Sequence, residues 1–130
     1  MEAKTRKKIV SETELFRSLI IFIEYIVPVI INTDKDIKVT FGYSILNKLI
    51  WSITTLRKAY NNKDAIEKGK TVDELNDVIC DVEIMLKIMF ELKYVSEKQQ
   101  SHISLSIGDI LSQVNGWKKA INAVNNNNVK

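Results

Sequence analysis

The fold is decided by two stretches, KVTFGYSILN at residues 38–47 and NGWKK at residues 115–119. The first has the features of a helix start, with Thr40 as the N-cap, and the second has those of a helix end. Between them apolar residues recur at helical spacing, and no segment alternates as a strand does. The whole chain has one proline and four glycines, which leaves little material for turns. These features predict a small number of long helices.

Length and composition describe one ordinary globular domain. The chain has 130 residues, enough to bury a single core, and 45% of them are hydrophobic while 27% are charged. The single cysteine, Cys80, excludes an internal disulfide and a cluster of thiolate metal ligands, and it fits a reducing cytoplasm. The N-terminus has no apolar run followed by a small-residue cleavage site, so we expect no secretory signal.

The first helix is predicted from about Glu12 to Ile31, with Ser11 as its N-cap. It carries two apolar stripes where a bundle helix needs one. The core-facing stripe is Leu15, Leu19, Phe22, Ile26 and Ile30, and the surplus stripe is Phe16, Ile20, Val27 and Ile31. The apolar run at residues 19–31 is 13 residues long, whereas a membrane span needs about 20. We therefore expect contact with neighbouring subunits and not with a membrane.

The second helix is predicted from Thr40 to about Asn61. Its core stripe is Ile45, Leu46, Leu49, Ile53, Leu56 and Tyr60. Trp51 falls almost opposite this stripe, on a polar face. A tryptophan there is either an anchor in an interface or a ring that lies flat on neighbouring side chains, and the sequence leaves both open.

A long loop at residues 62–70 precedes the third helix. Thr71 is predicted to open that helix, which ends near Val95, and Ser96 begins a capping box with Gln99 that opens the fourth helix. The third core stripe is Leu75, Ile79, Val82, Leu86 and Met89, and a second apolar edge is formed by Ile84, Ile88 and Val95. The fourth stripe has heptad spacing and consists of Ile103, Ile107, Ile110, Val114, Trp117 and Ile121.

Four helices with short connections predict an all-α, antiparallel up-down-up-down four-helix bundle. We assign the bundle to residues 11–124, between a basic arm at residues 1–10 and a polar tail at residues 125–130, both expected to be disordered. The surplus apolar edges predict that bundles associate into a ring-shaped homo-oligomer. The expected interface residues are Phe16, Ile20, Val27, Ile31, Trp51, Ile84 and Ile88.

Charge is unevenly distributed along the chain. Residues 73–83 contain five acidic residues and no basic one, so in a chain with net charge +3 the other 119 residues sum to +8. A basic cluster, Lys4, Arg6, Lys7 and Lys8, precedes the first predicted helix. This arm either contacts phosphates or is a solvated terminus, and both readings stay open. The candidate phosphate-binding residues on the bundle are Lys48, Arg57, Lys58, Lys87, Lys118 and Lys119.

The sequence offers few residues for catalysis. His102 is the only histidine, so neither a histidine metal cluster nor a Glu-x-x-His pair can be built. Asp77 and Asp81 lie one helical turn apart, but no apolar pocket is predicted around them, and a solvated face is the simpler reading. The glycines are scattered and form no phosphate-binding loop. We predict a protein that is not an enzyme and needs no metal or cofactor.

Four segments, in order, resemble one family of small helical proteins. Val27-Pro28 matches a Leu-Pro in its first helix, and residues 38–42 match a basic-Phe-Thr-Leu-Gly pattern that opens its second. Residues 92–96 match a Leu-Lys-Leu-Leu-Ser segment ending the third helix, and residues 115–119 match a Gly-Gly-Trp-basic segment ending the fourth. From about Glu14 to Ala120 the chain thus resembles the accessory variability determinant family of diversity-generating retroelements, which is related to four-helix-bundle proteins of ribosomal-RNA intervening sequences.

The resemblance implies a basic homopentamer of four-helix bundles, cytoplasmic, and encoded by a bacterium, an archaeon or a phage. Such a protein partners a reverse transcriptase and template RNA or cDNA during mutagenic retrohoming, contacts the RNA or DNA backbone with low specificity, and has no catalytic residues. Three positions that are basic in the family are here Glu83, Ser44 and Ser112. The alternative function is a stand-alone oligomeric scaffold of the intervening-sequence type.

Overall fold

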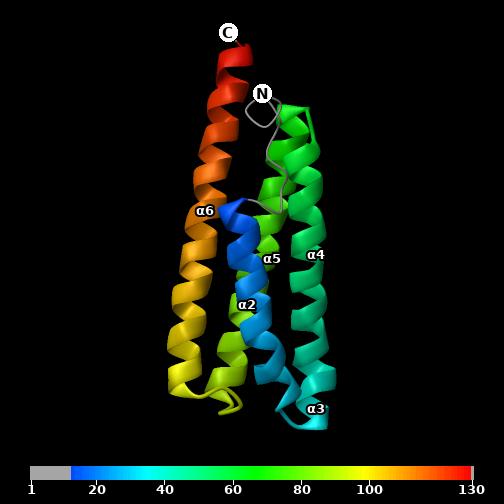
Figure 1. The fold of residues 1–130 in the computed structure, drawn as a ribbon, viewed down its shortest axis with the longest axis vertical. Helices are drawn as coiled ribbons and strands as arrows, with labels where there is room; N and C mark the ends of the chain where they lie inside the picture. Colours follow the sequence, from blue (N-terminus) through cyan, green and yellow to red (C-terminus); the bar gives the residue numbers. More distant parts are fainter. Residues whose placement is uncertain (1–12, 130) are drawn as a thin grey trace, which may run out of the picture.

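The first long helix, α2, spans Glu14–Ile31 in the computed structural model of the chain, which describes residues 13–129 (Figure 1). Its N-cap is Thr13, whose Oγ1 accepts a hydrogen bond from the Phe16 amide at 3.2 Å. The predicted N-cap, Ser11, lies outside the described residues. Pro28 lies in the last turn of α2, where the missing amide hydrogen removes one helical bond without ending the helix.

The connection from α2 to the next long helix is itself helical. Its parts are α3 at Lys35–Ile37 and a π-helical turn, η2, at Lys38–Gly42, which continues directly into α4 at Tyr43–Asn61. Thr40 lies exposed inside the π turn, so the prediction that it caps the second helix is wrong. Ile37 and Phe41 pack against the core from this segment. Their burial favours a helical continuation that the local sequence does not signal.

The third long helix, α5, spans Ala65–Glu91 and is longer than predicted. The prediction of a long loop at residues 62–70 is wrong, because Asp64 is the N-cap of the helix. Its Oδ1 accepts hydrogen bonds from the backbone amides of Ile66 and Glu67 at 3.0 and 3.4 Å. Gly69 is therefore a helical residue. It is buried where Ile121 packs against α5, with Ile121 Cγ2 3.5 Å from the position of a Cβ on Gly69.

The end of α5 is a Schellman motif. The Lys93 amide donates to the Phe90 carbonyl and the Tyr94 amide to the Met89 carbonyl, both at 2.9 Å, and Lys93 has a φ of 71°. The chain then turns inward at Val95, which is buried. The prediction that Val95 belongs to an exposed apolar edge is therefore wrong, because the helix ends before this residue and the turn redirects its side chain.

The last helix, α6, spans Glu97–Val129. The predicted capping box is confirmed: the Gln99 amide donates to Ser96 Oγ at 3.1 Å, and the Ser96 amide donates to Gln99 Oε1 at 2.9 Å. The helix continues through the polar segment for which disorder was expected. Asn125 Nδ2 donates to the Ala65 carbonyl at 3.4 Å, so the end of α6 is joined to the start of α5.

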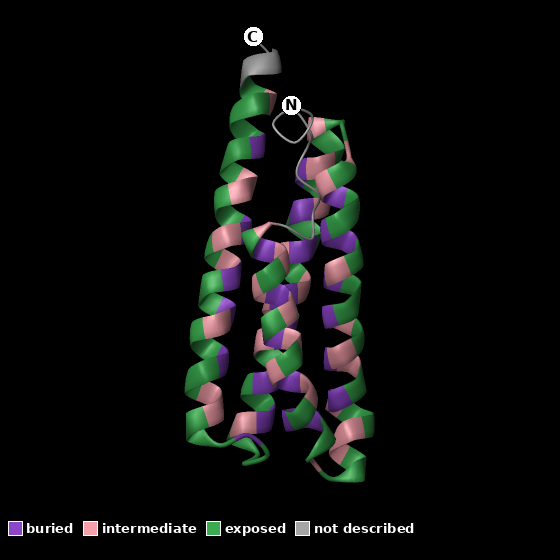
Figure 2. Ribbon diagram, viewed as in Figure 1, coloured by how far each residue is buried: buried purple, intermediate pink, exposed green. Residues whose placement is uncertain are grey.

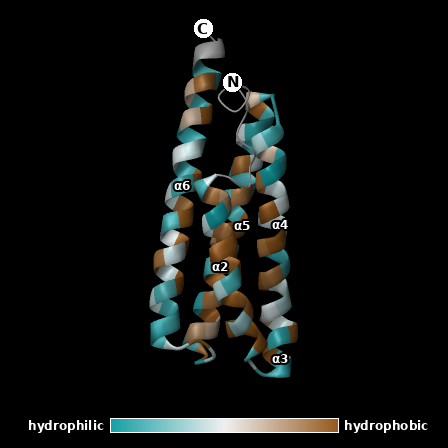
Figure 3. Ribbon diagram, viewed as in Figure 1, coloured by the Kyte–Doolittle hydropathy of each residue, from teal (hydrophilic) through white to brown (hydrophobic). Residues whose placement is uncertain are grey.

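The long helices run alternately down and up, so the predicted all-α, antiparallel four-helix bundle is confirmed for the described residues (Figure 1). Helix α5 packs against α4 and α6, and α2 closes the bundle against the same two helices. Buried and hydrophobic residues line the inner faces (Figures 2 and 3). The predicted core stripes of α2 and α5 are fully buried, and so is that of α6 except for Trp117, which is partly exposed.

One helix of the bundle is short. Helix α2 begins partway along its neighbours, whereas α4, α5 and α6 continue beyond its start (Figure 1).

On α4 the buried residues include Ile45, Leu49, Ser52, Leu56 and Ala59. The predicted core residues Leu46, Ile53 and Tyr60 are only partly buried.

Candidate nucleic-acid and oligomer surfaces

The described part of the chain is electrically neutral at pH 7. Of the 19 basic and 16 acidic residues, five basic and two acidic ones lie outside residues 13–129, which leaves 14 of each sign inside. The basic residues outside are Lys4, Arg6, Lys7, Lys8 and Lys130, and the acidic ones are Glu2 and Glu12. The net charge of +3 therefore belongs to the termini and not to the bundle.

Two of the six candidate phosphate-binding residues already face carboxylates of α5. Lys48 Nζ lies 4.0 Å from Asp81 Oδ2, and Lys118 Nζ donates a hydrogen bond to Asp73 Oδ1. The four side chains are partly exposed, so each pair contributes little to stability, about 0.2–1 kcal/mol. The pairs nevertheless lower the positive potential that either lysine presents to a phosphate.

The remaining four candidates are exposed but do not form one patch. Arg57 and Lys58 lie near the end of α4, and Lys119 lies on α6 two residues after Trp117, which lines a pocket together with Tyr60 of α4. Lys87 lies towards the opposite end of the bundle, one turn from Glu83. The basic residues at the end where α4 terminates are thus the best placed to act together.

The predicted interface residues divide into two groups. Ile31, Ile84 and Ile88 are exposed to 57%, 59% and 41%, and Trp51 is also exposed. The others are only partly exposed, and these are Phe16, Ile20 and Val27. The sequence reading missed further exposed apolar residues, among them Ile21, Ile50 and Leu105. Helical spacing could have marked Leu105, which lies opposite its core stripe.

Trp51 is not isolated on its helix face. It lines a shallow depression between α4 and α5 together with Val39, Tyr43 and Val78, and Lys48 lies at the same depression. Val39 and Tyr43 are themselves exposed. The polar residues Ser44 and Asn47 line the same depression, so the role of Trp51 as an interface anchor stays a prediction.

Two titratable side chains, His102 and Cys80, have distinctive surroundings. His102 on α6 is exposed and stacks on Tyr25 of α2, with ring centroids 3.9 Å apart and planes at 27°. Burial raises the pKa of the Cys80 thiol, and the neighbouring carboxylates Glu83, Asp77 and Asp81 raise it further. Within the described residues, no three His, Cys, Asp or Glu side chains gather closely enough to hold a metal ion.

Among the described helices, none combines the length and the apolar character that crossing a bilayer requires. Comparison of the chain with family models, with curated proteins and with solved structures gave no match.

Proposed function

We propose that this protein is a non-catalytic accessory bundle that self-associates and holds nucleic acid for a reverse transcriptase, as its resemblance to the accessory variability determinant family implies. The observation that supports self-association is the exposed apolar edge of α5. Ile84 and Ile88 lie one turn apart on α5, and their side chains are 59% and 41% exposed. Burying each side chain is worth roughly 1.5–3 kcal/mol, and a closed ring of five subunits would bury every copy.

Nucleic-acid binding follows from the charge distribution only if subunits assemble. A single neutral bundle with a short basic arm makes few phosphate contacts. A ring repeats the arm and the cations Arg57, Lys58 and Lys119 in every subunit, so weak contacts add along one backbone by avidity. Binding of this kind has low sequence specificity, because phosphate contacts carry no sequence information.

Self-association is tested by light scattering at micromolar concentration. The wild-type protein should have several times the mass of a 14.9 kDa chain. The double substitution Ile84→Glu/Ile88→Glu should give a folded species of lower mass, because two charges on the edge oppose burial. Leu105→Glu is the control, since Leu105 is the most exposed of the large apolar residues and lies on another helix. A folded wild-type monomer would refute the proposal.

Nucleic-acid binding is tested separately, by electrophoretic mobility shift of single-stranded RNA and DNA at about 50 mM salt, where phosphate contacts are strong. The neutral bundle and the acidic residue at Glu83 favour the second candidate, a stand-alone oligomeric scaffold. An oligomer that shifts neither RNA nor DNA would establish that candidate. A reverse transcriptase gene and a template repeat beside the gene for this protein would instead support the accessory role.

A further inference from the structure

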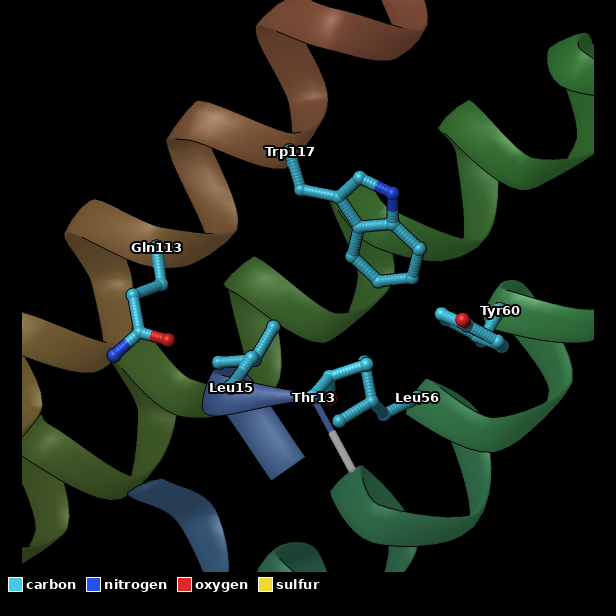
Figure 4. A pocket seen from close by; sticks show the side chains of 6 residues that line it. All are labelled: Thr13, Leu15, Leu56, Tyr60, Gln113 and Trp117. Carbon is cyan, nitrogen blue, oxygen red and sulfur yellow. The ribbon is translucent and has the colours of Figure 1, made fainter. Parts of the chain in front are cut away.

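An apolar pocket opens at the start of α2, where this helix begins short of its neighbours. Its volume is about 230 Å³, and it is lined by Thr13, Leu15, Leu56, Tyr60, Gln113 and Trp117 (Figure 4). The residues come from three helices and from the N-cap of α2. Trp117 projects from α6 and Tyr60 from α4 toward the same opening, above Thr13 and Leu15 (Figure 4).

The pocket has the character of an unfinished part of the core. Leu15 and Leu56 are buried, whereas the aromatic rings of Tyr60 and Trp117 remain partly exposed. Trp117 continues the spacing of the buried residues Ile110 and Val114 on α6, so its register places it inward, toward a pocket that Thr13 and Leu15 at the start of α2 also line. Water in such a pocket finds few polar partners, and an aliphatic side chain would be a better occupant.

The chain supplies a candidate occupant directly beside the pocket. Thr13, which lines the pocket, is joined to a 12-residue segment that lies outside the described residues. Val10 is three residues from Thr13, and three extended residues reach about 10 Å. Ile9 and Val10 are the only β-branched aliphatic residues of the segment, and four of the five residues before Ile9 are Lys4, Arg6, Lys7 and Lys8.

We propose that Ile9 and Val10 dock into the pocket between Trp117 and Tyr60 and complete the core above the start of α2. The docked pair would cover the pocket next to the N-cap of α2. The basic cluster that precedes the pair would then be held near Arg57 and Lys119, which are close in sequence to the pocket residues Leu56 and Trp117. This last consequence rests on the proposed function, whereas the docking itself does not.

The test uses the fluorescence of Trp117 in the full chain. Trp51→Phe leaves Trp117 as the only tryptophan, because the chain has two. In this background, Ile9→Ser/Val10→Ser should shift the emission of Trp117 to longer wavelength and increase its quenching by acrylamide, since the indole becomes hydrated. The matched control Lys7→Ser/Lys8→Ser alters the same segment but leaves the apolar pair, and it should change neither signal. Far-UV circular dichroism checks that all variants remain helical.

A second measurement does not depend on substitution of the segment. In the wild-type protein with labelled methyl groups, nuclear Overhauser effects should connect the methyls of Ile9 or Val10 with the indole protons of Trp117. Absence of these cross-peaks, together with unchanged fluorescence of the serine variant, would overturn the proposal. A red shift of Trp117 on dilution that is independent of Ile9 and Val10 would also overturn it, because a second copy of the chain would then be the occupant.

Discussion

Gly42 and Ile30 lie so close together that a Cβ on Gly42 would be 2.6 Å from Ile30 Cγ2. Gly42 ends the π turn η2, and Ile30 is fully buried in the last turn of α2. The missing side chain therefore lets the turn before α4 pack directly on α2. Gly42 has φ −59° and ψ −52°, an ordinary helical conformation, so its requirement is space and not backbone freedom.

We predict that Gly42→Ala lowers the free energy of unfolding by about 1–3 kcal/mol, because the added methyl overlaps the Cγ2 methyl of the buried Ile30 and one of them must shift. Gly108→Ala is the matched control. A Cβ at Gly108 meets nothing within 4 Å, and this residue is exposed within α6, so the substitution should stabilise the protein by about 0.5–1 kcal/mol through helix propensity. Urea denaturation measures both changes. Equal effects at the two glycines would contradict the packing argument.

The Schellman motif at the end of α5 makes a second prediction. Lys93 adopts a φ of 71°, which costs a residue with a Cβ roughly 1–2 kcal/mol relative to glycine. Lys93→Gly should therefore raise the free energy of unfolding by about 1 kcal/mol, since glycine favours this position of the motif. Lys93→Ala removes the same charge but keeps the Cβ, and it should leave the stability nearly unchanged. Thermal and urea unfolding of the three proteins separates the backbone effect from the effect of charge.

The ion pair between Lys118 and Asp73 predicts a gain in nucleic-acid affinity. Asp73→Asn releases the Lys118 ammonium, so binding should strengthen at low salt and its dependence on log salt should steepen by about one unit. Asp109→Asn makes the same change in net charge without releasing a lysine, because Asp109 Oδ2 accepts from Gln113. Measuring the dissociation constant of each variant for nucleic acid at several salt concentrations distinguishes the two substitutions. Identical slopes would mean that Lys118 does not contact phosphate.

Cys80 makes a prediction about thiol reactivity. Burial, and then Glu83, Asp77 and Asp81, raise the pKa of this thiol, so at pH 8 it should react with iodoacetamide more slowly than a free thiol does. Glu83→Gln removes one negative neighbour, which lowers the pKa, increases the thiolate fraction at a given pH and speeds the reaction. Glu97→Gln, at the start of α6, should have no such effect. An alkylation rate that is unchanged in the Glu83 variant would show that Glu83 does not influence the thiol.

The sequence by itself determined the helical class and most of the core. Apolar spacing placed the buried faces of α2, α5 and α6, and the Ser96–Gln99 pattern located the start of α6. These features are local: side-chain periodicity and capping hydrogen bonds involve residues within a few turns of one another, so they can be read from the chain. The same reasoning found the exposed edge at Ile84 and Ile88.

Only the tertiary structure decided where the connections lie and which charges meet. Gly69 reads as a loop residue but belongs to α5, where Ile121 packs against it from more than fifty positions away along the chain. Lys118 reads as a free cation but faces Asp73 of another helix. Each outcome depends on contacts between segments distant in sequence, and their burial and Coulomb energies outweigh the weaker local preferences on which sequence reading relies.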